Sequence, residues 1–201
     1  VGDKEYIHPA PTRMIWRPDK MICEYELEDI LIREEKFIGK NDAAASIITS
    51  SKPVIFRFEG HSFYVRHSLS STAEISYQKE NNTIIILEGG TVRSKPDPNG
   101  PVRTGPCVYQ GMTTALSASK DFSDTFISEI GQNGEQKYKF EIPCDDNGVI
   151  VSWAMDDDRE KAVLKTVGIV SQAKKSLASK TQSSFGSQVM TSIFATSFAA
   201  L

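Results

Sequence analysis

The stretch that decides the fold is QKYKFEIPCDDNGVIVSWAM, residues 136–155. Apolar and charged side chains alternate over residues 138–142, and large apolar side chains recur at every second position over residues 149–155. A period of two indicates a strand with one buried face. Between the runs, Asp146-Asn147-Gly148 is a strong signal for a tight turn. The stretch therefore predicts two antiparallel strands joined as a hairpin.

Strand signals continue on the N-terminal side of this hairpin. Residues 73–88 alternate, turn at Asn81-Asn82 and resume as the run TIIIL, which predicts a second hairpin because Asn tolerates left-handed backbone angles. Residues 46–58 hold two more β-branched runs. Residues 21–38 alternate in part but carry many Glu residues that would suit a helix; without a sustained 3.6-residue period, we favour strands. Further strands are expected at residues 113–118 and 122–130.

The pattern changes after residue 155. Asp157 and Glu160 have the spacing of a capping box, which predicts a helix over residues 158–179. Residues 181–201 suit a second amphipathic helix, or a segment that packs on a partner. The predicted fold class is mainly β, an antiparallel β-sandwich followed by C-terminal linker helices. We divide the chain into a sandwich domain, residues 1–155, and a helical segment, residues 156–201.

Composition and motifs exclude several classes of function. The net charge is -3, and the isoelectric point of about 5.7 argues against a nucleic-acid partner. The sequence has no run of 18 apolar residues, so it does not predict a membrane-spanning helix. The three cysteines have no zinc-site spacing, and no nucleophile elbow or phosphate-binding loop occurs, so no cofactor, metal site or catalytic residue is predicted. No compartment is assigned, and an extracellular or periplasmic one stays open.

The candidate binding residues lie on a predicted loop and in the N-terminal arm. Four prolines within residues 93–107 predict a long loop that leads into GPCVYQGM, residues 105–112. Aromatic, amide and guanidinium groups suit contact with sugar rings, which makes Arg103, Tyr109 and Gln110 candidates for carbohydrate binding. An ordinary structured connection is the alternative. Residues 1–20 predict an irregular arm anchored by Trp16, which is also a candidate sugar-binding aromatic.

Three segments in order carry a resemblance to a known family. They are NDAAASIITSSKPVIFRFEGHSF (41–63), ENNTIIILEGGTVRSKPDPNGP with GPCVYQGMTTALSASKDF (80–122), and VIVSWAMDDDREKAVLKTVGIV (149–170). Their layout resembles the N-terminal β-supersandwich domain of glycoside hydrolases with an (α/α)6 barrel, including glucosidase, trehalase-like and glycogen-debranching-like members. The resemblance implies an accessory domain that braces a catalytic (α/α)6 domain and lends a loop to its sugar cleft. The family's catalytic acid and base lie in that barrel, so no position here inherits them.

Two further hypotheses stay open beside the accessory domain. A free-standing carbohydrate-binding module would place exposed aromatic residues on one face. A protein-interaction sandwich would expose an apolar patch larger than monomeric proteins usually tolerate. A complete small enzyme is disfavoured by the lack of a recognisable nucleophile, metal or cofactor motif.

Overall fold

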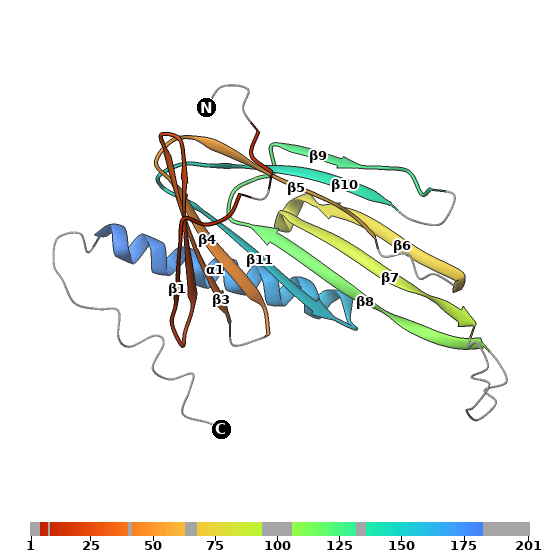
Figure 1. Ribbon diagram of the computed structural model, residues 1–201. Helices are drawn as coiled ribbons and strands as arrows, with labels where there is room; N and C mark the ends of the chain where they lie inside the picture. The colour runs from red at the N-terminus through yellow and green to blue at the C-terminus, as the bar shows by residue number, and fades with distance from the viewer. Residues whose placement is uncertain are drawn as a thin grey trace, which may run out of the picture.

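The computed structural model describes residues 5–7, 9–39, 42–62, 68–93, 106–131 and 136–182. Its strands form two antiparallel sheets (Figure 1). The large sheet has the strand order β1 (Arg13–Trp16), β2 (Met21–Leu27), β3 (Ile30–Ile38), β4 (Ala44–Ser50), β11 (Val149–Asp156), β8 (Pro106–Ala118), β7 (Thr83–Arg93) and β6 (Ser68–Gln78). The covering sheet has the order β5 (Val54–His61), β10 (Lys137–Cys144) and β9 (Asp124–Ile127).

The molecule has three layers. Helix α1 (Arg159–Gln182) lies along one face of the large sheet, and the covering sheet packs on part of the other face (Figure 1). A short 3₁₀ helix, η1 (Lys79–Asn81), lies in the turn between β6 and β7. The predicted fold class, an antiparallel β-sandwich followed by a C-terminal helix, is confirmed. The second helix predicted within residues 181–201 falls almost wholly outside the described residues.

Aromatic side chains fill much of the space between the two sheets. The ring of Phe140 on β10 stacks on Phe58 and Tyr138, with centroids 5.5 Å and 5.4 Å away, and meets the edge of Phe122 at 5.0 Å. These rings pack against buried Ile84 and other side chains of the large sheet. Offset aromatic pairs of this kind add to the free energy of burial, so this cluster joins the two layers.

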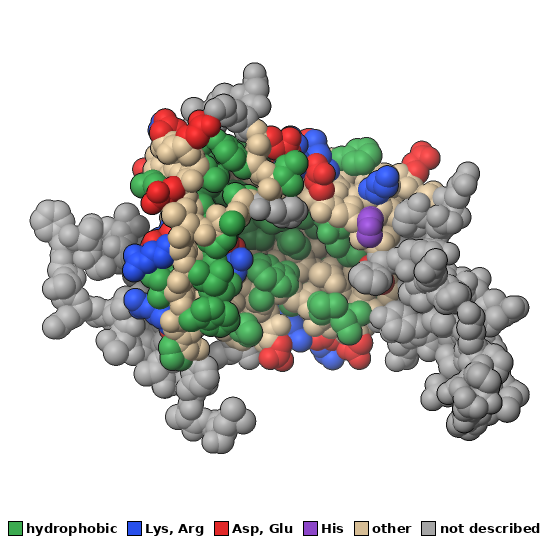
Figure 2. All heavy atoms as spheres, viewed as in Figure 1, with side chains coloured by type: hydrophobic (Ala, Val, Ile, Leu, Met, Phe, Trp, Pro, Cys, Tyr) green, Lys and Arg blue, Asp and Glu red, His purple; other side chains and the backbone are tan. Residues whose placement is uncertain are grey.

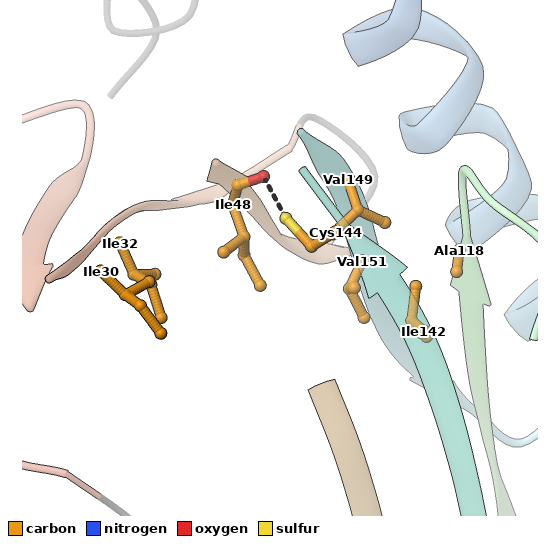
Figure 3. Close-up of a cluster of buried hydrophobic side chains, with 8 residues drawn as sticks. All are labelled: Ile30, Ile32, Ile48, Ala118, Ile142, Cys144, Val149 and Val151. Carbon is orange, nitrogen blue, oxygen red and sulfur yellow. Dashed lines mark hydrogen bonds between the residues drawn. The ribbon is translucent and has the colours of Figure 1, made fainter. Parts of the chain in front are cut away.

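Both strands predicted at residues 136–155 are present, but the predicted hairpin is wrong. β10 pairs with β5 and β9, whereas β11 pairs with β4 and β8, so the turn between them carries the chain from one sheet to the other. Figure 3 shows the consequence: Ile142 and Cys144 from β10 meet Val149 and Val151 from β11 in one core cluster. The inner faces of both strands are apolar, so the strands pack face to face across the two sheets instead of pairing as neighbours in one sheet.

The Asp-Asn-Gly turn has the local geometry that its sequence predicts. Gly148 has φ +75°, and its N–H donates to the carbonyl of Asp145 at 3.0 Å. The Asp145 carboxylate accepts from the backbone N–H of Asn147 at 3.1 Å. A Cβ on Gly148 would lie 2.8 Å from the carbonyl oxygen of Ile48, so the turn also needs glycine for the close approach of β4.

We expect Gly148→Ala to lower the free energy of unfolding by about 1–3 kcal/mol, because it places a side chain in left-handed backbone geometry and against Ile48. Urea unfolding followed by circular dichroism measures the change. The control is Gly168→Ala at an exposed position of α1, where a methyl group meets no atom within 4 Å and should stabilise the protein by about 0.5–1 kcal/mol. Equal stability changes in the two variants would contradict the prediction.

Other strand predictions divide into confirmed and wrong ones. Residues 73–88 form the β6–β7 hairpin, with Asn82 at φ 47° after the turn. Residues 21–38 are strands β2 and β3, which settles the strand-or-helix alternative. The loop predicted to include residues 105–112 is wrong, because Pro106 to Met112 belong to β8 and pair with β7. The backbone groups of the two long strands hydrogen-bond to each other there. The prolines between the strands fall in residues 94–105, outside the described part.

Helix α1 begins where the acidic run predicts, but one residue later than the predicted cap. The Asp158 carboxylate accepts from the backbone N–H groups of Glu160 and Lys161 at 2.8 Å and 3.2 Å. Asp158, rather than Asp157, is therefore the N-cap. The Asp156 carboxylate instead pairs with Lys165, nearly two turns into the helix, at 2.8 Å.

A chain of buried hydroxyl groups fixes α1 on the sheet. Ser117 Oγ on β8 lies 2.7 Å from both Thr83 Oγ1 on β7 and Thr166 Oγ1 on the helix. Ser152 Oγ on β11 donates to the Thr166 carbonyl at 3.0 Å. Apolar contacts surround this chain, among them Ala162 against the sheet. Since a buried hydroxyl is costly without a partner, the network sets the position of the helix along the strands.

Candidate functional site

The covering sheet leaves part of the sandwich face of the large sheet uncovered. Along β11 the exposed fraction rises from 0% at Val149 and 2% at Val151 to 39% at Trp153 and 55% at Met155. The covering sheet therefore shields only the first half of β11 from solvent. Figure 2 shows hydrophobic side chains gathered over the middle of this face, where the surface is hollowed.

We call the uncovered apolar side chains the open strip; its members are Met14, Trp16, Ile38, Trp153, Met155 and Met112. Directly opposed residues of antiparallel neighbours share a face. Trp16 opposes Met21, Met21 opposes Lys36, Lys36 opposes Ser46 and Ser46 opposes Val151, a core residue of the sandwich. The alternation of side chains along each strand then places the other members on the same face as Trp16.

The open strip has two ends. Met14 and Trp16 lie on β1 at the sheet edge and form the Trp16 end. The remaining four members come from β3, β11 and β8 and form the Trp153 end. β1 and β11 are four strand spacings apart, which puts the Trp16 and Trp153 backbones roughly 19 Å apart across the sheet. One small ligand cannot touch both tryptophans.

A polar cluster lies beside the Trp16 end. The Glu34 carboxylate accepts from Ser46 Oγ at 2.8 Å and from the Tyr25 hydroxyl at 3.1 Å, and it pairs with Lys36 Nζ at 3.2 Å. Burial, with the nearby Glu34 charge, raises the pKa of Tyr25, so its hydroxyl stays a hydrogen-bond donor at neutral pH. Lys36 is partly exposed and lies on the same face of the sheet as Ser46 and Val151.

Among the described residues, Trp16 lies far from the other predicted carbohydrate-binding residues, Tyr109 and Gln110. Trp16 is 76% exposed in strand β1, so it does not anchor the N-terminal arm as predicted; the arm is held instead by an Arg57–Glu5 ion pair. Tyr109 and Gln110 belong to β8, and Arg103 lies outside the described residues. The residues directly opposed to Trp16 across successive strands end on β8 at Ala118. Tyr109 is nine residues from Ala118, a distance of about 30 Å along the strand.

The candidate site residues predicted from sequence did not include Trp153, Lys36 or Glu34. Trp153 shares the alternation of Val149 and Val151, a pattern that predicts burial, and only the limited width of the covering sheet exposes it. Glu34 and Lys36 read as solvent-facing charges of an alternating strand. No local signal distinguishes a charge that faces a hollow in the sandwich from one that faces solvent.

The carboxylates with shifted pKa values have structural partners. Hydrogen bonding to Lys165 holds the pKa of Asp156 well below its usual range, and hydrogen bonding to Lys139 lowers the pKa of Asp124. The Asp124–Lys139 pair, at 2.7 Å, links β9 to β10. These ionised carboxylates therefore stabilise contacts between neighbouring strands and between strand β11 and helix α1. Within the described ranges, no three His, Cys, Asp or Glu side chains come close enough to hold a metal ion.

Cys23 and Cys144 are buried free thiols. Burial raises the pKa of Cys144 to about 11, and its thiol donates to the Ile48 carbonyl at 3.4 Å (Figure 3). The thiolate is the reactive form of cysteine, so Cys144 is a packing residue rather than a nucleophile. In the part of the chain that the structure describes, no helix is long and apolar enough to cross a membrane.

The chain has a distant likeness to known proteins among solved structures. No family model matches the chain, and no curated protein matches it. Among solved structures it is similar to a protein described as "Putative kojibiose phosphorylase from human microbiome", with 12% sequence identity and a TM-score of 0.38. The match covers 83% of this chain and 22% of that one, so this chain spans about a fifth of that protein's length. A likeness this distant carries no conclusion about activity.

Proposed function

We propose that this chain is a non-catalytic β-sandwich domain of a carbohydrate-active enzyme, and that the Trp153 end of the open strip packs against the enzyme's catalytic domain. In this arrangement residues 1–155 are the sandwich and residues 156–201 are the connecting segment. The layout of the three sequence segments that resemble the glycoside hydrolases supports the choice of an (α/α)6 domain as partner. Tyr109 and Gln110 on β8 remain candidates for the residues lent to its sugar cleft.

The observation that carries the proposal is the apolar character of the Trp153 end. Ile38, Trp153 and Met155 are adjacent on one face, because Ala44 opposes both Ile38 and Trp153 and Met155 follows Trp153 in β11. Their exposed fractions are 78%, 39% and 55%. Contiguous apolar surface of this kind marks interaction sites, and domains within one chain commonly meet through such surfaces.

The first experiment is the intact mass of the protein purified from its natural source. The proposal expects a mass several-fold above the 22.2 kDa of this chain. A mass equal to this chain would overturn the proposal, because no catalytic domain would then be attached.

The second experiment is methionine footprinting, in which dilute hydrogen peroxide oxidises exposed thioethers and mass spectrometry measures the rate at each residue. Met155 and Met14 have similar exposed fractions in this chain, 55% and 51%. The proposal expects Met155 to oxidise several-fold more slowly in the longer protein than in this chain, and Met14 to be unchanged. Equal rates for Met155 in the two proteins would show that nothing packs on the Trp153 end.

A further inference from the structure

We infer that the Trp16 end of the open strip is a binding subsite for one ring of a neutral saccharide. The inference deepens the proposed function and rests on it for the source of the saccharide, the substrate of the parent enzyme. The binding itself is a property of this chain. Three observations carry the inference: an exposed indole, a hydrogen-bonding pair within reach of it, and the balanced charge of that pair.

The indole of Trp16 provides a stacking surface. Trp16 is 76% exposed, and it is on the same sheet face as Met21 and Lys36, which follow it across the sheet. Its backbone is two strand spacings from that of Lys36, about 10 Å. That span accommodates one sugar ring lying on the indole with hydroxyls directed at Lys36. Met21, half-buried between them, forms an apolar floor.

The Glu34–Lys36 pair retains hydrogen-bonding capacity. A carboxylate has about four acceptor sites and an ammonium has three donors. Among the described residues, Glu34 accepts from Ser46, Tyr25 and Lys36, and Lys36 contacts only Glu34. One acceptor site and two donors therefore remain on a pair that its neighbours already hold in place. Adjacent donors and acceptors beside an aromatic face match the hydroxyl groups of a sugar.

The charge of the pair selects the class of ligand. Glu34 and Lys36 cancel each other at 3.2 Å, so the subsite offers no net charge to attract an anion or a cation. Ser46 and Tyr25 add only neutral hydroxyls. A neutral saccharide gains hydrogen bonds there without breaking the ion pair, whereas an acidic sugar would compete with Glu34 for Lys36. The neutral saccharide is therefore the occupant that fits.

The test uses the tryptophan fluorescence of this chain, whose two tryptophans are Trp16 and Trp153. Trp153→Phe leaves Trp16 as the sole indole, and Trp16→Phe leaves Trp153. Each variant is titrated with maltotriose, with cellotriose and with glucuronate. We expect a saturable emission change with at least one neutral trisaccharide in Trp153→Phe, and none in Trp16→Phe, whose remaining indole is too distant.

Lys36→Met in the Trp153→Phe background is expected to weaken the trisaccharide affinity about tenfold, because it removes the donors and keeps the aliphatic stem. Lys137→Met, on the covering sheet, is the matched control and should leave the affinity unchanged. Absence of saturation with both trisaccharides, tighter binding of glucuronate, or equal affinity in the two lysine variants would overturn the inference. Methionine protection in the longer protein tests the proposed function separately.

Discussion

Phe140→Ala is expected to lower the free energy of unfolding by about 3–5 kcal/mol, the range for a large aromatic side chain removed from a core. Phe140 is 1% exposed, and its ring contacts Phe58, Tyr138 and Phe122. Truncation removes the ring on which the other three meet, and the neighbouring strands cannot close the cavity without breaking their registers. The loss should appear as a lower urea midpoint with little change in slope.

Phe126→Ala is the matched control for this prediction. Phe126 lies on β9 of the same covering sheet, opposite Lys139, but its side chain is exposed on the outer surface. It should change the free energy of unfolding by no more than about 0.5 kcal/mol. If the two phenylalanines proved equally important, the aromatic cluster would not be what joins the sheets.

Asn82→Ala is expected to cost about 3 kcal/mol, through two separate effects. The Asn82 side chain accepts from the Tyr77 hydroxyl at 2.9 Å and donates to the carbonyls of Ala118 and Lys120 at 3.0 Å and 2.6 Å. Losing this side chain leaves its buried polar partners without hydrogen bonds, which lowers the free energy of unfolding by about 1–3 kcal/mol. Alanine at φ 47° adds left-handed strain of about 1–2 kcal/mol.

Two further variants separate these effects. Asn82→Gly removes the same hydrogen bonds but tolerates the left-handed angle, so it should be about 1 kcal/mol more stable than Asn82→Ala. Asn81→Ala, at the neighbouring exposed position, should be close to neutral. Chemical unfolding of the three variants under one set of conditions provides the comparison. Asn82→Gly with the stability of the natural sequence would show that the hydrogen bonds contribute nothing.

The turns and strands follow from local sequence because their causes are local. Asn82 and Gly148 adopt the left-handed angles that their side chains permit, and the alternation over residues 138–142 and 149–155 does form strands. Helix α1 likewise starts at an acidic cap. In each case a short stretch carries its own stereochemistry or its own buried face.

The candidate site depends on long-range geometry that the sequence does not express. The turn at Gly148 is compatible with a hairpin or with a crossing between sheets, and only the burial of Ile142 and Val151 against each other selects the crossing. That choice places the covering sheet over one part of the large sheet and leaves Trp153 bare.

The sequence by itself therefore determined a strand-rich sandwich, its turns and the start of its helix, because period, capping and left-handed residues act within a few positions. The tertiary structure alone decided which strands share a sheet and where the cover stops. It also decided which side chains gather beside Trp16, where Glu34 and Lys36 from β3 meet Ser46 from β4. The physical reason is that burial and opposition across strands are set by partners distant in sequence, and alternation is the same whether or not a second layer covers the face.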